Sequence, residues 1–275
     1  MPVRILGMIG VTPPKSDATL IIIEGALAPD YIVESARAHE AAGYDMALVG
    51  YSSSSAEGFL VALHAAHHTE RLKFLVAHRP GFVQPTLMAR KIATFDQLTR
   101  GRLAVHIITG KTDAEQHGDG DFSAKPERYE RAAEYLGVMR RVWTETAPFD
   151  FAGRFYRVAG AQSDVFPFQK PYPEILFGGA SEGALAMGAE HCDTYAMYAE
   201  PLAAAQKRIG EMRERGPGAG GHWVSTFRLG PSSGIQRPRP GRRRTPFSPS
   251  WRAGLNVGGA GRREAGRRSI MPGGG

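Results

Sequence analysis

The amino-acid sequence predicts an α/β fold whose strands lie parallel in one sheet. Short apolar runs bounded by Gly and Pro suit strands that are buried on both faces. These runs alternate with segments whose apolar residues recur at helical spacing. The clearest unit runs from Leu72 to Gly110, where an apolar run, a helical segment and a second apolar run follow one another. A strand, a helix and a strand of this length form a βαβ unit, which makes the two strands parallel.

The remaining elements continue this alternation. We expect strands at residues 4–11, 46–49, 72–77, 103–108, 174–177 and 193–197. We expect helices at 29–42, 57–68, 85–98, 126–143, 181–189 and 201–213, with a hairpin at 149–158. The order counts six strand–helix units, whereas a (β/α)₈ barrel needs eight, so we expect a barrel truncated after about six units.

The helix at 85–98 illustrates how a buried face is predicted. Its apolar residues Leu87, Ile92, Phe95 and Leu98 fall close to helical spacing, with Asp96 on the other side. The apolar set is therefore expected to face the sheet.

Composition limits the class of protein. A chain of 275 residues can bury a large core, and its single cysteine, Cys192, excludes an internal disulfide and a multi-cysteine metal site. No stretch reaches the roughly 18 apolar residues needed to span a bilayer, and nothing near the N-terminus has a signal-peptide pattern. We therefore expect a cytoplasmic protein that does not contact a membrane.

The sequence changes character at Gly216. Residues 216–275 hold fifteen Gly, seven Pro and eleven Arg, with one Glu and no Lys or Asp, so they carry a charge of +10 and residues 1–215 carry −3. Such a segment buries too little apolar surface to offset its chain entropy. We expect a barrel domain at 1–215 and a disordered tail at 216–275.

Translation out of frame would explain the change, and the other two reading frames of the gene test it. Nucleic-acid binding by the tail is not expected, because no folded basic face supports it.

Polar residues follow the apolar runs, at the strand ends where parallel α/β folds bind ligands. His78-Arg79 follows one strand, and His106 to Thr109 ends the next. Arg79 presents a planar fork suited to sulfonate or phosphate oxygens. The alternative is that the His78-Arg79 pair only satisfies backbone carbonyls.

The turn Gly178-Gly179-Ala180-Ser181 leads from a strand into a helix N-terminus, where free N–H groups attract phosphate. A simple turn is the alternative. His64 and His68 stand four residues apart without an acidic or cysteine partner, so no metal site is expected. The acidic loop at 111–125 is expected to be a mobile lid.

Several segments resemble the bacterial luciferase-like flavin monooxygenases, and most closely their alkanesulfonate monooxygenase branch. The likeness covers about residues 1–213 and rests on AGYDMALVGYSSSSAEGF, TERLKFLVAHRPGFVQPTLMARKIATFDQLTRGRLAVHIITG, DGDF with ERY, and PFQKPYPEILFGGASEGA.

The resemblance implies a TIM-like barrel that binds FMN in its reduced form (FMNH₂), supplied by an NAD(P)H-dependent flavin reductase. The enzyme would use O₂ to oxidise a small-molecule substrate, and in this branch it would convert an alkanesulfonate to an aldehyde and sulfite. A homo-oligomer is expected. Two alternatives stay open: hydride transfer with the deazaflavin F420, which shares this fold, and a truncated remnant without catalysis.

The resemblance also implies site residues. The expected cofactor contacts are Ser54, Ser55, His78, His106, Thr109, Tyr129, Gly178, Gly179, Ala180 and Ser181. The expected catalytic residues are Ser55, His78 and Arg79. Tyr129 and Gly179 to Ser181 would hold the ribityl chain and phosphate, although by spacing alone Tyr129 is core packing and the serine run is a loop. A non-proline cis bond is expected near Ala77-His78.

The chain departs from the family pattern at four places. Ser55 stands where the branch often has Cys, and Thr12-Pro13-Pro14 replaces an N-terminal His. Lys125 stands where a His is common, and the last two barrel units have no counterpart in the sequence. These changes bear on the sulfonate substrate more than on the flavin.

Overall fold

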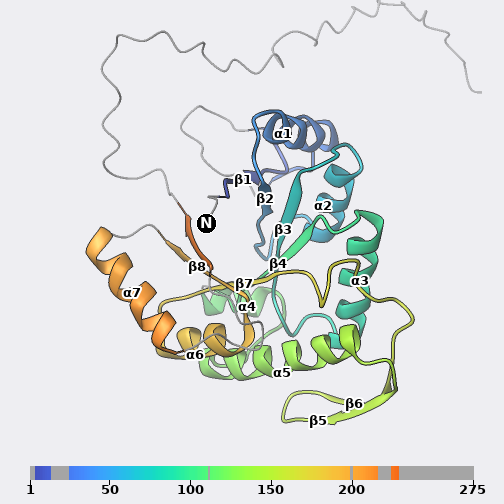
Figure 1. Ribbon diagram of the computed structural model, residues 1–275, viewed down its shortest axis with the longest axis vertical. Helices are drawn as coiled ribbons and strands as arrows, with labels where there is room; N and C mark the ends of the chain where they lie inside the picture. Colours follow the sequence, from blue (N-terminus) through green and yellow to red (C-terminus); the bar gives the residue numbers. More distant parts are fainter. Residues whose placement is uncertain (1–3, 14–24, 111, 199–200, 216–223, 229–275) are drawn as a thin grey trace, which may run out of the picture. The chain divides into compact units, whose positions relative to one another are not determined.

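The computed structural model describes residues 4–13, 25–110, 112–198, 201–215 and 224–228. Seven described strands form one parallel sheet, shown in Figure 1, in the order β1 (Leu6–Ile9), β2 (Met46–Val49), β3 (Lys73–His78), β4 (Leu103–Ile107), β7 (Ile175–Gly178), β8 (Thr194–Tyr198) and β9 (Val224–Arg228). The hairpin is β5 (Phe149–Ala152) with β6 (Arg157–Ala161). The parallel sheet and the hairpin are thus confirmed.

Helices connect consecutive strands of the sheet. They are α1 (Pro29–Ala41), α2 (Gly58–Ala66), α3 (Pro85–Leu98), α4 (Asp113–Gly118), α5 (Lys125–Thr144), α6 (Glu182–His191) and α7 (Leu202–Glu214). The six predicted strand–helix units are therefore present, and Figure 1 shows α1, α2 and α3 following one another along the first strands. Among the described residues, no helix is both long and apolar enough to cross a membrane.

Alternate residues of each strand point to opposite faces of the sheet. One face packs on the helices through residues such as Phe74 and Val76. The other face forms a separate buried cluster of Met46, Leu75, Ala104 and Leu176, one from each of four strands. Because both faces are buried, the strands read as continuous apolar runs.

An ion pair joins strands that are far apart in the sheet. Arg4, two residues before β1, donates to both carboxylate oxygens of Glu174, one residue before β7, at 2.8 Å each. Three strands separate β1 from β7 along the sheet order. The contact therefore requires a curled sheet, as in the expected TIM-like barrel.

The buried face of α3 differs in part from the prediction. Ile92 and Phe95 are buried, but Leu87 and Leu98 are 52% and 58% exposed. Asp96 is fully buried because its carboxylate accepts hydrogen bonds from the backbone N–H and the side-chain amide of Gln169, at 2.8 and 2.7 Å. The two donors offset the cost of burying the carboxyl group, and apolar spacing cannot reveal such partners.

The strand β9 was not expected. Its residues, Val224 to Arg228, pair in parallel register with Thr194 to Tyr198 of β8. The prediction of a wholly disordered segment after residue 215 is therefore wrong at these five residues. Residues 216–223 and 229–275 lie outside the described part of the chain.

The expected cis bond near Ala77-His78 is not found. In the described ranges the cis peptide bond is Lys170-Pro171.

Candidate functional site

The turn between β7 and α6 brings two predicted residues together. Ser181 is the N-cap of α6, and its hydroxyl oxygen accepts a hydrogen bond from the N–H of Ala184 at 3.3 Å. The hydroxyl of Tyr129, on α5, lies 3.1 Å from the same oxygen. The N–H groups of Glu182 and Gly183 precede the first backbone hydrogen bond within the helix. Two hydroxyls and free N–H groups therefore converge on one helix terminus.

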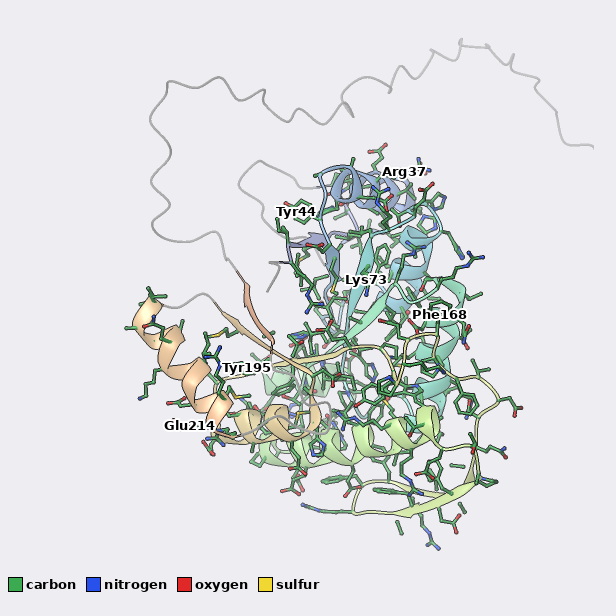
Figure 2. The ribbon with its side chains drawn as sticks, viewed as in Figure 1. Arg37, Tyr44, Lys73, Phe168, Tyr195 and Glu214 are labelled. Carbon is green, nitrogen blue, oxygen red and sulfur yellow. The ribbon has the colours of Figure 1, made fainter. Side chains whose placement is uncertain are left out.

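Glycines fix the geometry of this turn. A Cβ on Gly183 would lie 3.0 Å from Cδ2 of Tyr129, so the missing side chain lets the Tyr129 ring lie against the first turn of α6. A Cβ on Gly178 would lie 2.6 Å from the carbonyl oxygen of Ala196 on the neighbouring strand. Tyr195, labelled in Figure 2, donates its hydroxyl to the carbonyl of Gly179 at 2.5 Å. The turn is held from both sides.

An acidic side chain stands beside this terminus and is neutralised. Glu182, the first residue of α6, forms two hydrogen bonds of 2.9 Å with the guanidinium of Arg215. The carboxylate of Glu182 alone would repel an anion bound at the free N–H groups. Pairing with Arg215 offsets that negative charge.

The serine run after β2 forms a closed turn. The hydroxyl of Ser55 donates to the carbonyl of Ser52 at 2.9 Å and accepts from its N–H at 3.0 Å. The hydroxyls of Ser52 and Ser54 lie 3.3 Å apart. Ser53 donates to the carbonyl of Glu115 on α4 at 2.6 Å. Ser55 thus orders the turn, and Ser53 connects it to α4.

His78 lies on the helix-facing side of the sheet, away from the other predicted contacts. Phe74 and Val76, four and two residues earlier on β3, pack on the helices, and strand alternation places His78 with them. Its Nε2 is 3.0 Å from the hydroxyl of Tyr135 on α5, and its ring meets Phe59 edge-on. Burial lowers the pKa of His78 to about 3, so the ring is neutral. The sequence therefore predicted that His78 ends a strand, but it did not reveal which face of the sheet the ring occupies.

His106 and Thr109 lie at the end of β4. Leu103, Val105 and Ile107 belong to the helix-facing core, whereas Ala104 belongs to the opposite cluster. Alternation therefore puts His106 on the face of Ala104, inside the curl, where it is in register with Ala77 and Leu176. Thr109, two residues after the end of β4, is half-buried.

Arg79 is held by two carboxylates. Its side chain is 2% exposed, and its guanidinium donates to Glu115 at 2.6 Å and to Asp119 at 3.2 Å. The hydroxyl of Tyr51 donates to the same Asp119 carboxylate at 2.8 Å, and the guanidinium lies 4.4 Å from the centre of the Tyr51 ring. In this arrangement the fork of Arg79 fixes α4 and is not open to a ligand anion.

The predicted acidic loop contains this short helix, which sequence reasoning missed. Thr112 is the N-cap of α4, accepting from the N–H of Glu115 at 3.3 Å. The pattern Thr112-Asp113-Ala114-Glu115 fits the S/T-x-x-E signal of a helix start and was the available clue. Asp113 is paired with Arg128 at 3.1 Å, and Asp121 is paired with Arg131, which lowers the pKa of Asp121 to about 2 although burial opposes it. Ion pairs thus hold the segment on α5.

A concavity of about 480 Å³ lies at the other end of the sheet. Its lining includes Arg71 and Arg102, which precede β3 and β4. The guanidinium of Arg102 donates to the backbone carbonyls of Ala66 and Leu72, at 2.8 and 3.3 Å. This end of the sheet is therefore a structural junction, and it is not part of the site.

The donor set at α6 fits the phosphate of the expected cofactor. Two hydroxyls, from Tyr129 and Ser181, and two backbone N–H groups can all donate to phosphate oxygens. Gly178 and Ala196 stand in register at the adjacent strand ends, where the missing side chain of the glycine lets the two backbones approach closely. The described residues contain no group of three His, Cys, Asp or Glu side chains that could hold a metal ion.

Comparison with known proteins identifies a family and solved structures of similar fold. The luciferase-like monooxygenase family model matches residues 8–266. Three solved structures are similar in fold: a riboflavin lyase with modified FMN and riboflavin (17% identity, TM-score 0.69), the EDTA monooxygenase from Chelativorans sp. BNC1 (17%, 0.66) and the coenzyme F420-dependent tetrahydromethanopterin reductase from Methanopyrus kandleri (16%, 0.68).

The matches cover 82%, 81% and 82% of this chain, but only 61%, 61% and 65% of those three chains. The chain therefore spans less than two thirds of the length of these structures. Since the family model matches most of the sequence, the chain belongs to the luciferase-like monooxygenase family.

Proposed function

We propose that the protein is a monooxygenase that uses reduced FMN and O₂ to oxidise a small molecule. The observation that carries the proposal is the phosphate-sized donor set of Tyr129, Ser181 and the first turn of α6, at the carboxyl end of β7. Ligands of parallel α/β folds bind at this end of the strands. Family membership supplies the reaction class.

The residues of this chain bind and orient the cofactor. The hydroxyls of Tyr129 and Ser181 would hold the phosphate, with Gly179 and Ala180 as the backbone of the turn. His106, facing the inside of the curl, and Thr109 would lie under the ring. Bound reduced FMN supplies two electrons to O₂, so that one oxygen atom enters the substrate and the other leaves as water.

The serine turn and His78 have supporting roles in this proposal. Ser54 and Ser55 would meet the edge of the ring nearest β2, since the closed turn places them after that strand. His78 would act through Tyr135 and the packing of β3 on α5, because its ring lies on the helix side. A flavin reductase dependent on NAD(P)H would supply the reduced cofactor.

An alkanesulfonate is the proposed substrate class, cleaved to an aldehyde and sulfite, and the sequence resemblance supports it. Arg79 is the expected sulfonate ligand, but Glu115 and Asp119 occupy its guanidinium. Sulfonate binding at Arg79 would require α4 to move away. The test is sulfite release from a series of linear alkanesulfonates with reduced FMN and O₂; no release from any of them would remove this substrate class.

Transfer of a hydride with F420 is the second candidate. Reduced F420 and reduced FMN both carry a tricyclic ring on a ribityl chain that bears a phosphate, so the same donor set suits both. One of the similar folds is an F420-dependent reductase. Anaerobic titration of the purified protein with each reduced cofactor separates the two candidates. Binding of reduced FMN alone supports the first, and binding of F420 alone replaces it with the second.

A non-catalytic remnant is the third candidate. In the described sheet, β1 and β9 each pair on one side, and open strand edges favour aggregation. Cooperative thermal unfolding of a monodisperse protein, together with binding of either cofactor, would exclude it.

A further inference from the structure

The concavity of about 480 Å³ where β3 and β4 begin gathers positive charge. Its lining carries three guanidinium groups and one carboxylate, from Arg71, Arg100, Arg102 and Glu70. Residues 1–215 as a whole have a net charge of −3, so this lining differs in sign from the domain around it. A concave surface lined by one sign of charge concentrates ions of the opposite sign. The concavity is therefore suited to an anion.

The three arginines differ in what their guanidinium groups bind. Arg102 donates only to groups of the protein, namely the carbonyls of Ala66, Leu72 and Thr99 and the hydroxyl of Thr69. Arg71 and Arg100 are exposed, and within the described ranges neither guanidinium has a hydrogen-bond or ion-pair partner. Arg102 thus contributes a fixed charge, whereas Arg71 and Arg100 have donors available to a ligand.

Strand pairing brings Arg71 and Arg100 to the same place. Phe74 and Leu103 stand in register on the parallel strands β3 and β4, and each arginine lies three residues earlier in the chain. Lys73, labelled in Figure 2, marks this end of β3. Each planar guanidinium can donate two parallel hydrogen bonds to phosphate oxygens. Two such groups at one concavity suit two phosphate groups.

The backbone of Arg100 is in the left-handed region, with a φ of +54°. It follows Thr99, the C-cap of α3, at a position where glycine is the usual residue because a Cβ is unfavourable there. Residues held in such conformations cluster at ligand-binding sites. The chain therefore keeps an arginine where a glycine would be more stable, which indicates a role for its side chain.

Carboxylates of the protein limit where an anion can bind. The carboxylate of Glu40 accepts hydrogen bonds from the backbone N–H groups of Glu70, Arg71 and Leu72. These three N–H groups are thus already used, and an added anion depends on the guanidinium groups. The side chain of Glu70 is exposed in the lining, where its charge opposes the anion.

We propose that this concavity binds a diphosphate group through Arg71 and Arg100, either as free pyrophosphate or as part of a nucleoside diphosphate. Each guanidinium takes one phosphate, and Arg102 adds a third positive charge. The volume lies in the range of about 300–1,000 Å³ that small-molecule sites occupy, and the exposed side chain of Leu98 in the lining offers apolar surface to an organic group. Since the concavity is at the opposite end of the strands from Tyr129 and Ser181, the inference is independent of the proposed function.

The experiment is calorimetric titration at low ionic strength with phosphate, pyrophosphate and ADP. Arg71→Gln and Arg100→Gly each remove one guanidinium, and Glu70→Gln removes the opposing charge. Arg157→Gln is the matched control, because Arg157 is exposed on β6 and does not line the concavity.

We expect wild type to bind pyrophosphate at least about tenfold more tightly than phosphate, because two guanidinium groups are engaged instead of one. Arg71→Gln and Arg100→Gly should each weaken pyrophosphate binding by a similar factor, and Glu70→Gln should strengthen it. Arg157→Gln should match wild type. Without ligand, Arg100→Gly should melt no lower than wild type, because glycine adopts the left-handed conformation without strain. Tighter binding of ADP than of pyrophosphate identifies a nucleotide as the ligand, and ADP binding no tighter identifies the free diphosphate.

Absence of pyrophosphate binding to wild type at millimolar concentration would overturn the inference. Unchanged affinity in Arg71→Gln or Arg100→Gly, or an equal loss in Arg157→Gln, would overturn it too. Tyr129→Phe should bind pyrophosphate as wild type does, and a loss of affinity in that variant would place the diphosphate at α6 instead. None of these outcomes bears on the binding of reduced FMN.

Discussion

Replacing Tyr129 by Phe separates cofactor binding from folding at the phosphate site. The ring of Tyr129 meets Phe177 edge-on, with 6.4 Å between centroids, and lies against Gly183. Phenylalanine keeps these contacts. The hydroxyl that it removes is bonded to Ser181 in an exposed position, so the free energy of unfolding should change little.

The expected loss of affinity follows from the charge of the phosphate. A hydrogen bond to a charged group contributes about 1.5–3 kcal/mol, which corresponds to roughly 10- to 150-fold weaker binding when it is lost. Ser181→Gly should have a similar effect. Glycine is tolerated at the N-cap at a cost of only a few tenths of a kcal/mol, whereas alanine costs about 1 kcal/mol, so the glycine variant tests the hydroxyl with little loss of helix stability.

The assay is anaerobic calorimetric titration with reduced FMN and, in parallel, with reduced riboflavin, which lacks the phosphate. Tyr129→Phe should weaken the binding of FMN and leave that of riboflavin unchanged. Chemical denaturation of each variant checks that the fold is intact. If Tyr129→Phe bound FMN as tightly as wild type, or lost FMN and riboflavin to the same extent, the phosphate would not bind at this hydroxyl.

Two further predictions concern stability. The pKa of His78 is about 3 in the folded protein against an ordinary value of 6.5, so its contribution to stability is complete above about pH 6.5 and is lost as pH falls toward 3, by up to about 1.4 kcal/mol per pH unit. Urea unfolding of wild type should therefore show a steeper loss between pH 6.5 and 4 than His78→Phe does, and equal slopes would contradict a neutral, buried ring. The two-bonded pair of Arg4 and Glu174 joins distant strands of the curled sheet, and Glu174 also accepts from Thr194 at 2.5 Å. Glu174→Ala should lower the unfolding free energy by about 1–3 kcal/mol. The double variant Arg4→Ala/Glu174→Ala should not regain most of this loss. An unchanged unfolding free energy would mean that the curl does not depend on this contact.

Element type and order could be read from the sequence because each strand is a continuous apolar run and each helix has a periodic apolar face. The six units and the hairpin at 149–158 followed from these patterns. The direction of individual side chains was harder. Whether His78 faces the helices or the inside of the curl depends on which alternate residues of β3 point to each face of the sheet. A strand that is apolar on both faces does not reveal this.

Buried polar residues account for the other differences. Asp96 and Gln116 are both fully buried, the first bonded to Gln169 and the second under Gly110. Sequence patterns treat such residues as solvent-facing, and the partner that satisfies Asp96 lies far along the chain. The strand at 224–228 was missed because Gly, Pro and Arg dominate the composition around it, while its pairing with β8 depends on backbone bonds that composition does not encode.

A crystal structure of the protein grown anaerobically with reduced FMN tests the central claim most directly. The account predicts the phosphate against the first turn of α6, within hydrogen-bond distance of the hydroxyls of Tyr129 and Ser181. A phosphate bound elsewhere on the chain, with these two hydroxyls still bonded to each other, would contradict it.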